Sequence, residues 1–267
     1  MTRFFVLAFS LTWLCWLPAA FIPGGTNSTA GTLLVDAGSA GPLIALLISL
    51  APRRQGEERA RWRRRMTNFE GLASPAGLLC VLLPILLAQW AMDTYAITGG
   101  IRLPPASIPD ALSLLVPTLL FGALPEELAW RGYALPVMVR GRQSLAPTVL
   151  LAAAWGLWQL PLFFIKGTYE AGIEITSAAG FLHFAGLAGQ SVLMTAFYLA
   201  TRCTWAAILF HWLTSFMGEF WQLPVRAEIH RALWTLLVAG IVLLLRPPFG
   251  IRGPEKPAGS TRQAPRL

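Results

Sequence analysis

Long apolar stretches follow one another along almost the whole 267-residue chain, with short polar segments between them. Most are close to the roughly 20 residues that an α-helix needs to cross the hydrocarbon core of a bilayer, and too long for the strands of a membrane barrel. We therefore predict an all-α protein, a polytopic transmembrane helical bundle of about eight spans. The predicted spans are Arg3–Ile22, Thr32–Ala51, Gly71–Met92, Asp110–Val139, Ser144–Ile165, Ser177–Thr201, Thr204–Leu223 and Ile229–Leu245.

The fourth predicted span is longer and more polar than the others. It contains Pro117, Pro125 and Pro136, and a proline inside a helix removes a backbone donor and clashes with the preceding turn. A kinked or broken helix is therefore expected. Such a break survives at membrane depth only where protein packs around it.

The composition supports a membrane protein. Apolar residues make up 55% of the chain and charged residues 13%, about half the charged fraction of an ordinary soluble domain. The cysteines are odd in number and fall in or near apolar stretches, so we expect buried thiols and no disulfide framework. They are Cys15, Cys80 and Cys203.

Basic residues are distributed unevenly between the segments that join the spans. The segment Pro52–Phe69, interpreted as a loop, holds seven arginines and two glutamates, so we expect it on the cytoplasmic side. Eight spans place 16 basic residues on that side and four on the other. The sequence thus predicts a multi-pass protein of the cell membrane with both termini in the cytoplasm.

One transmembrane domain is predicted over residues 1–249, followed by a Pro-, Gly- and Arg-rich tail over 250–267 that we expect to be disordered and cytoplasmic. The net charge of +8 would also suit a nucleic-acid-binding protein. The arginines, however, lie beside apolar spans and not along a folded basic face, so we expect no nucleic-acid partner. The bilayer itself is the expected partner.

Charged residues inside a predicted span carry the strongest functional signal, because burying a charge in a membrane costs several kcal/mol unless it is paired or hydrated. The stretch PEELAWRGY (125–133) contains three. Glu127 and Arg131 are four residues apart and can form an ion pair on one helix face, whereas Glu126 is rotated by about 100° and faces other surroundings. Alternatively, both glutamates only fix helix packing, or the stretch is an interfacial turn.

Other polar residues lie in apolar stretches. Gln159 stands in WGLWQLP (155–161), where a buried amide can simply bond a neighbouring helix. His211 and Ser215 share a helical face, although a lone membrane histidine is more often a packing residue. Further polar residues in or beside the spans are Asp36, His183, Gln190 and Glu219, of which we expect Glu219 at the interface.

Together and in this order, these groups resemble the motifs of the CAAX protease and bacteriocin-processing (CPBP) family of intramembrane proteases, which is related to the type II CAAX prenyl endopeptidase. The first motif of that family is Glu-Glu-x-x-x-Arg, and Glu126, Glu127 and Arg131 match it fully. Gly132 and Tyr133 follow, as residues of these types often do in the family.

The second and third motifs match in part. The second is Trp-x-x-Trp-His-Leu-Pro in bacterial members, and here Gln159 stands at the histidine position. The third is His-x-x-x-Asn, in which His211 fits and Ser215 stands at the asparagine position. The stretch SAGPL (39–43) resembles an early Gly-Pro element, so the resemblance covers roughly Gly38 to Phe216.

The resemblance implies an intramembrane endopeptidase in which Glu126 activates water for attack on a peptide bond. Glu127 with Arg131 would be an orienting ion pair, and His211 with Ser215 would contact the oxyanion. Gln159 cannot take up a proton near neutral pH and is a poor zinc ligand, whereas zinc has been considered for the family. The cofactor therefore stays open, with the substitution arguing against a dependable metal site.

Three functions follow from these observations. The first is a peptidase of the CAAX-processing type that acts on a peptide or lipidated protein. The second is a pseudoprotease that keeps the fold and serves as a membrane scaffold or immunity-type factor. The third is a small secondary transporter, since broken helices with buried carboxylates also form proton-coupled sites. The peptidase is the leading hypothesis, and it would make the chain a hydrolase similar to the CAAX prenyl endopeptidase.

Overall fold

The computed structural model describes residues 1–52, 55–101, 104–140 and 145–245. All regular elements in this part are helical, which confirms the all-α prediction. The α-helices are α1 (Thr2–Ala19), α2 (Thr29–Ser39), α3 (Gly41–Leu50), α4 (Gly56–Thr67), α5 (Pro75–Ile97), α6 (Ile108–Pro117), α7 (Leu124–Ala129), α8 (Leu135–Met138), α9 (Ala146–Trp158), α10 (Ala178–Thr201), α11 (Thr204–Phe220) and α12 (Val225–Leu245). Predictions for Arg53, Arg54, Arg102, Arg142, Ser144 and the tail lie outside the described residues.

Seven segments of the described chain are long and apolar enough to cross a membrane. They are Thr2–Ala19, Thr29–Leu50, Pro75–Ile97, Ile108–Met138, Ala146–Phe164, Ala178–Thr201 and Val225–Leu245. The prediction Thr204–Leu223 corresponds to α11, which has 17 residues and is not among the seven. Its 17 residues extend about 25 Å, at the short end of what a span requires. Its polar residues, including His211 and Glu219, lower its apolar character.

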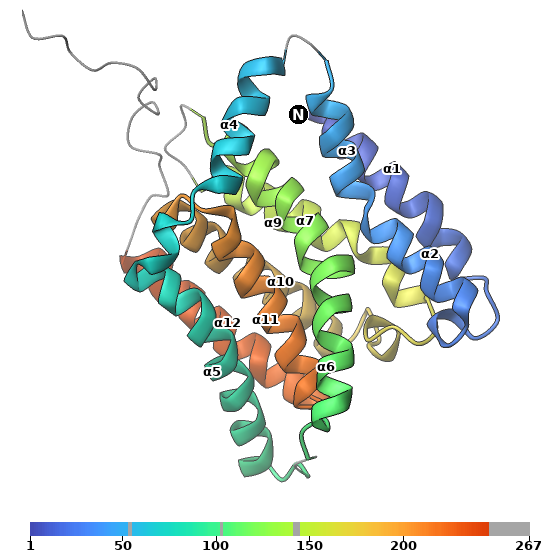
Figure 1. Ribbon diagram of the computed structural model, residues 1–267. Helices are drawn as coiled ribbons and strands as arrows, with labels where there is room; N and C mark the ends of the chain where they lie inside the picture. Colours follow the sequence, from blue (N-terminus) through green and yellow to red (C-terminus); the bar gives the residue numbers. More distant parts are fainter. Residues whose placement is uncertain (53–54, 102–103, 141–144, 246–267) are drawn as a thin grey trace, which may run out of the picture.

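Two groups of helices surround the helical segment that carries the Glu-Glu-x-x-x-Arg motif (Figure 1). In one group α1 packs against α2 and α3, and in the other α5, α10, α11 and α12 pack against one another. The segment α6–α8 lies between them, because α7 contacts both α3 and α11. The motif is thus enclosed by protein and not by lipid.

Close approach of α1 to the α2–α3 junction depends on two glycines. A Cβ atom on Gly38 would lie 2.3 Å from the Trp16 ring, and one on Gly41 would lie 2.2 Å from Thr12 Oγ1. The Thr12 hydroxyl donates to the Gly38 carbonyl oxygen at 2.8 Å and accepts from Trp158 Nε1 at 2.8 Å. Gly38 and Gly41 therefore let α1 approach the α2–α3 junction closely, and Thr12 of α1 joins that junction to α9 by hydrogen bonds.

The outer surface carries large apolar side chains, while several charged ones are inside. Leu14, Leu78 and Phe181 are more than half exposed, whereas Glu127 and Arg131 are fully buried. This distribution is the reverse of a soluble protein and is the one expected for helices whose outer faces contact lipid.

The prediction of a loop over Pro52–Phe69 was wrong in one respect, because residues Gly56–Thr67 form the helix α4. Glu57 and Glu58 lie in its first turn and Arg64 and Arg65 in its last, so the charges complement the helix dipole. The high charge of this segment had indicated a solvated connection, whereas in the structure it is a short surface helix.

Candidate active site

The Glu-Glu-x-x-x-Arg motif lies on an irregular helix. Two π-helical segments, η4 (Thr118–Ala123) and η5 (Trp130–Ala134), flank α7. The predicted interruption is therefore confirmed as two stretches of widened turns. Pro125 and Pro136 are the second residues of the α-helical parts that follow, and neither has an N–H to give the carbonyl of the preceding turn. Widened turns of this kind are frequent at functional sites.

The predicted ion pair is formed. Arg131 Nη1 donates to Glu127 Oε1 at 2.8 Å, and both side chains are fully buried. Arg131 Nη2 donates to Ser191 Oγ on α10 at 2.7 Å, and the guanidinium carbon lies 5.2 Å from the centre of the Trp155 ring. This burial excludes the alternative of an exposed interfacial turn.

His211 on α11 joins this pair. Its Nδ1 lies 3.0 Å from the same oxygen, Glu127 Oε1, and its ring packs edge-on against Trp155. Because Arg131 is always protonated and the carboxylate accepts its hydrogen bond, Nδ1 must carry the proton in the hydrogen bond from His211. The Nε2 atom of His211 is then the ring nitrogen left for other partners.

Glu126 has surroundings of its own, as the helix geometry predicted. Its Oε2 accepts a hydrogen bond from Trp155 Nε1 at 2.7 Å, and no hydrogen bond between Glu126 and Arg131 is formed among the described residues. Glu126 retains 7% exposure, whereas Glu127 has none. One glutamate is thus held by a cation and the other by a neutral indole.

Glu126 lines a cavity of about 390 Å³. Gln159, His211 and Ser215 also line it, so the structure brings four of the six predicted site residues to one cavity. Glu127 and Arg131 are not among the lining residues and lie behind His211 and Trp155. Gln159 is buried, whereas Ser215 is exposed.

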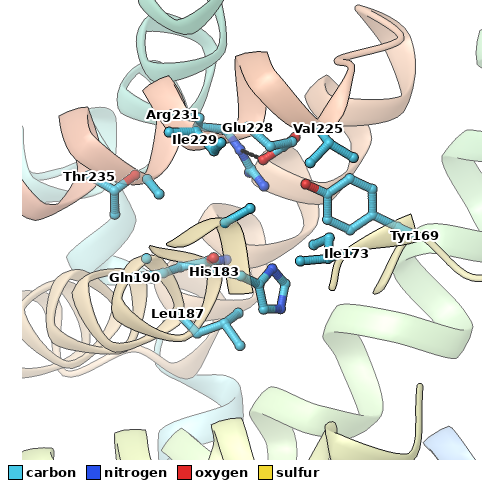
Figure 2. A pocket seen from close by; sticks show the side chains of 13 residues that line it. Tyr169, Ile173, His183, Leu187, Gln190, Val225, Glu228, Ile229, Arg231 and Thr235 are labelled. Atoms are coloured by element: carbon cyan, nitrogen blue, oxygen red, sulfur yellow. Dashed lines mark hydrogen bonds and ion pairs between the residues drawn. The ribbon is translucent and has the colours of Figure 1, made fainter. Parts of the chain in front are cut away.

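The cavity is also lined by polar residues that lie outside the three sequence motifs. They come from the loop after α9 and from α10, α11 and α12, and they are Tyr169, Glu170, His183, Gln190, Glu219, Glu228 and Arg231. Five of these residues, Tyr169, His183, Gln190, Glu228 and Arg231, also line an adjoining side pocket of about 50 Å³ between α10 and α12 (Figure 2). Glu219, which we expected at the interface, lines the larger cavity and not the side pocket.

The side pocket contains both paired and unpaired polar atoms. Arg231 Nε donates to Glu228 Oε2 at 2.5 Å, and Arg231 Nη1 donates to the Thr214 carbonyl oxygen at 3.3 Å. His183 Nε2 is buried and has no hydrogen-bond partner among the described residues. The His183 ring instead packs against Phe163, Tyr169 and Phe184.

Glu170 lies in the loop between α9 and α10, in a one-turn helix η7 (Glu170–Gly172). The pKa of its carboxyl is raised to about 7, mainly by burial and in smaller part by the nearby charges of Glu126, Glu219 and Glu228, while a hydrogen bond from its own backbone N–H opposes the change. Burial likewise raises the pKa of Tyr169. Besides Glu126, the cavity is therefore lined by a carboxyl group from a loop, and the pKa of that loop carboxyl is raised towards neutral pH.

Sequence reasoning had no means of finding several of these contacts. Ser191 is one hydroxyl in a long apolar helix, and its role in holding Arg131 depends on how α10 packs. Glu170 lies in a loop whose position relative to Glu126 no helical spacing predicts. Of these contacts, only that of the Trp155 indole could have been suspected from the sequence, because Trp155 is the aromatic residue that begins the second motif.

The residues present do not fit a zinc ion. Among the described residues, no group of three or more His, Cys, Asp or Glu side chains could hold a metal ion. Glu127 Oε1 is already shared by Arg131 and His211, and the second-motif position is the amide Gln159. We therefore derive no step through a metal.

Residues 108–217 match the sequence model of a family described as type II CAAX prenyl endopeptidase Rce1-like. The chain is also similar to CAAX prenyl protease 2 of Methanococcus maripaludis, with 24% identity over 254 residues, which cover 90% of this chain and 92% of that protein. The chain is related to the CPBP family. The relation predicted from the motifs is thereby confirmed.

The matched region extends from the start of α6 to the last turns of α11 and includes all six predicted site residues. The similarity to the archaeal protease extends over nearly the whole chain and so also includes the helices on both sides of that region. At the family level, the chain is therefore a multi-pass membrane protein related to CAAX-type endopeptidases.

Proposed function

We propose that this protein is an intramembrane endopeptidase of the CAAX-processing type in which Glu126 activates water. The observation that supports this proposal is that the two adjacent glutamates have different surroundings. Glu126 reaches the cavity beside a neutral indole, whereas Glu127 is held behind it by Arg131 and His211. A carboxylate with a free oxygen at a cavity can accept a proton from water.

In the proposed reaction, the attacking water gives one proton to Glu126 as its oxygen bonds to the peptide carbonyl carbon. The charge that develops on the carbonyl oxygen is stabilised by donors at the same cavity, which are His211 when doubly protonated and the hydroxyl of Ser215. The C–N bond then breaks, and the proton on Glu126 passes to the leaving amine. Gln159 hydrogen-bonds the water but accepts no proton.

Glu127 and Arg131 act through His211 in this proposal. The hydrogen bond between Glu127 Oε1 and His211 Nδ1 fixes the ring and leaves Nε2 for the oxyanion. Because Nδ1 already carries a proton, donation from Nε2 requires the imidazolium form of His211. Arg131 donates to the same carboxylate oxygen and so helps to hold Glu127 in place.

The substrate class follows from the cavity and the relative. The cavity lies within a bundle whose outer surface is apolar, so a substrate reaches it from the membrane or its surface. The relative is named a CAAX prenyl protease, and we propose prenylated peptides as the first substrates to test. Unprenylated membrane peptides are the second class.

A cleavage assay tests the mechanism with wild type, Glu126→Ala and Gln159→His side by side. Glu126→Ala should abolish cleavage, because the water loses its proton acceptor. Gln159→His should raise the rate by up to about 10²-fold if the imidazole reaches the same water. Cleavage that persists in Glu126→Ala would refute the mechanism.

The pseudoprotease remains the second candidate because Gln159 and Ser215 replace two residues of the family motifs. A scaffold would cleave none of the peptides, in any of the three variants, and would still bind a peptide in the cavity. The relation to an endopeptidase family favours either of these functions over a secondary transporter.

A further inference from the structure

Helix α4 links two spans and is the most highly charged helix of the described chain. It follows α3 and precedes α5, so it lies where these spans leave the membrane (Figure 1). Two aromatic contacts support a position at the membrane surface: Trp205 Nε1 donates to the Met66 carbonyl oxygen at 2.9 Å, and Phe69 packs against the Trp205 ring. Tryptophan is enriched at this depth.

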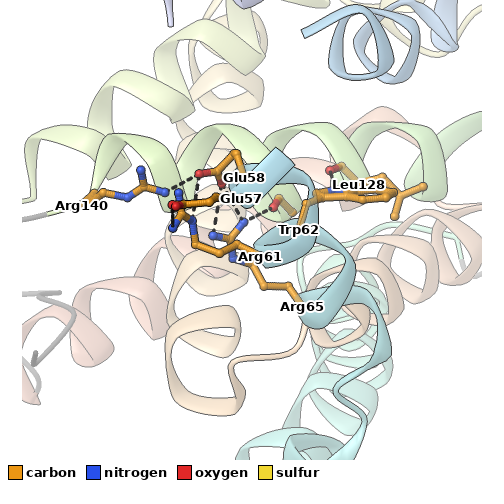
Figure 3. Close-up of polar contacts among 8 residues, drawn as sticks. Glu57, Glu58, Arg61, Trp62, Arg65, Leu128 and Arg140 are labelled. Carbon is orange, nitrogen blue, oxygen red and sulfur yellow. Dashed lines mark hydrogen bonds and ion pairs between the residues drawn. The ribbon is translucent and has the colours of Figure 1, made fainter. Parts of the chain in front are cut away.

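The inner face of α4 is organised by one buried carboxylate. Glu58 pairs with Arg61 at 3.2 Å, with Arg65 at 3.4 Å, and with Arg140, which follows α8, at 2.5 Å (Figure 3). Burial alone would raise the pKa of Glu58, but the hydrogen bonds and charges of these arginines outweigh burial and lower it. Glu58 therefore stays ionised and ties α4 to the end of the motif-bearing helix.

Two further contacts reach the motif itself. Arg65 Nη1 donates to the Gly132 carbonyl oxygen at 3.2 Å, and Trp62 Nε1 donates to the Leu128 carbonyl oxygen at 3.4 Å. Four residues after Gly132 is Pro136, which has no N–H to give that carbonyl. Arg65 thus supplies a donor that the helix lacks.

Gly132 makes this close packing possible. A Cβ atom there would lie 3.1 Å from Met66 Cε and 3.3 Å from Trp62 Nε1, both on α4. Gly132, directly after Arg131, is therefore the residue at which α4 packs against the motif-bearing helix. Contacts at Leu128, within the Glu126–Arg131 segment, and at Gly132, directly after it, connect this segment to a helix at the membrane surface.

The outer face of α4 carries excess positive charge. Arg63 and Arg64 are exposed and form no ion pair with an acidic residue in the described part of the chain. Helix α4 carries five arginines and only two glutamates, and its docked position brings a sixth cation, Arg140, beside Glu58. Mutual repulsion of these cations opposes docking, and an anion bound at the outer face would relieve it.

We propose that α4 binds anionic lipid headgroups through Arg63 and Arg64, and that this binding holds the Glu126–Arg131 segment in place through Arg65 and Trp62. Anionic lipids are the anions that a basic helix meets at a membrane surface, and they attract arginines that lie close to the headgroups. The lipid favours the docked helix because docking concentrates the charges that the lipid neutralises. The protein would thus respond to the charge of its membrane.

Thermal melting in lipid nanodiscs tests the binding step. Wild type is compared in discs of phosphatidylcholine alone and of phosphatidylcholine with phosphatidylglycerol. We expect the anionic lipid to raise Tm by about 4 °C or more, from two arginines at about 2–4 °C each. The double variant Arg63→Ala/Arg64→Ala should lose this increase.

The matched control is Lys166→Ala/Arg226→Ala, which removes two exposed basic residues from segments away from α4. It should keep the full increase in Tm. No increase in wild type, an equal increase in the Arg63→Ala/Arg64→Ala variant, or an equal loss in the control would each overturn the proposal. This measurement uses no substrate, so its outcome is independent of whether the protein cleaves peptides.

Hydrogen exchange tests the transmission step. In wild type, the amides of residues 124–134 should exchange several-fold more slowly in the anionic discs than in the neutral ones. Arg65→Ala should lose that difference while the Tm increase from Arg63 and Arg64 remains, and Arg65→Lys should retain part of it. If wild type shows no difference, or if Arg65→Ala keeps it, α4 does not transmit lipid binding to the motif.

Discussion

One carboxylate oxygen of Glu127 holds two other residues of the candidate site in place. Its Oε1 accepts from Arg131 and from His211, while its Oε2 is buried without a hydrogen-bond partner among the described residues. A buried carboxylate is tolerated only while its charge is compensated. The spacing of Glu127 and Arg131 allowed this pair to be predicted, because helical geometry alone brings them together. The contribution of Ser191 and the position of Glu170 could not be predicted, because they depend on tertiary packing.

Arg131→Ala should lower stability by about 3–5 kcal/mol, because the buried charge of Glu127 would lose its main partner. Glu127→Gln in the same background should restore part of the loss. Thermal melting in detergent measures both, with the exposed Arg226→Ala as the control that should melt like wild type. A wild-type melting temperature in Arg131→Ala would mean that the pair is hydrated and contributes little.

Glu170 should make stability depend on pH in a defined direction. Its pKa is about 7 in the folded protein, above the ordinary value of 4.5, so the folded state holds the proton more tightly. The stabilising contribution is therefore complete below pH 4.5 and is lost as the pH rises through 7. Glu170→Gln should melt with a smaller decrease in Tm between pH 5 and 8 than wild type. Glu174→Gln, exposed in the same loop, should behave as wild type.

At the scale of elements, the positions of the long apolar helices were predictable because span length and hydrophobicity dominate a membrane sequence. Helix α4 was not predictable in this way, because its charges indicated a solvated loop. Its packing depends on the pairing of Glu58 with Arg140 and on its contact with Gly132, which lie far apart in the sequence. The interruption of the fourth helix was predicted from its prolines, but its form was not. Whether widened turns or a sharp kink result depends on the neighbouring helices that satisfy the freed carbonyls.

Gly132→Ala tests the contact between α4 and the motif. The added Cβ would be crowded by Met66 and Trp62, and we expect a loss of about 1–3 kcal/mol together with faster trypsin cleavage at the arginines of α4. Gly240→Ala in α12 is the control, because a Cβ there meets no atom within 4 Å. That control should be neutral or slightly stabilising, as alanine is the better helix former. Equal effects of the two substitutions would show that α4 does not rest on Gly132.

For the whole molecule, the arrangement of basic residues and the course of α11 together determine the topology. A two-residue connection joins α10 to α11, and α11 packs beside α5 and α10, so it returns across the bundle despite its 17 residues. If α11 is a crossing, we expect the chain to pass through the membrane eight times. The seven apolar segments alone would put the two termini on opposite sides.

We expect α4 and both termini on the cytoplasmic side, and the loops containing Lys166 and Arg226 on the other. Single cysteines at positions 64, 166 and 226, in a variant without Cys15, Cys80 and Cys203, can be labelled with a membrane-impermeant maleimide. Lys166→Cys and Arg226→Cys should react in intact cells, and Arg64→Cys only after permeabilisation. A reporter fused to the C-terminus should be active in the cytoplasm. If the C-terminal reporter is active only outside while Arg64→Cys stays protected, the number of crossings is odd and α11 does not traverse the membrane.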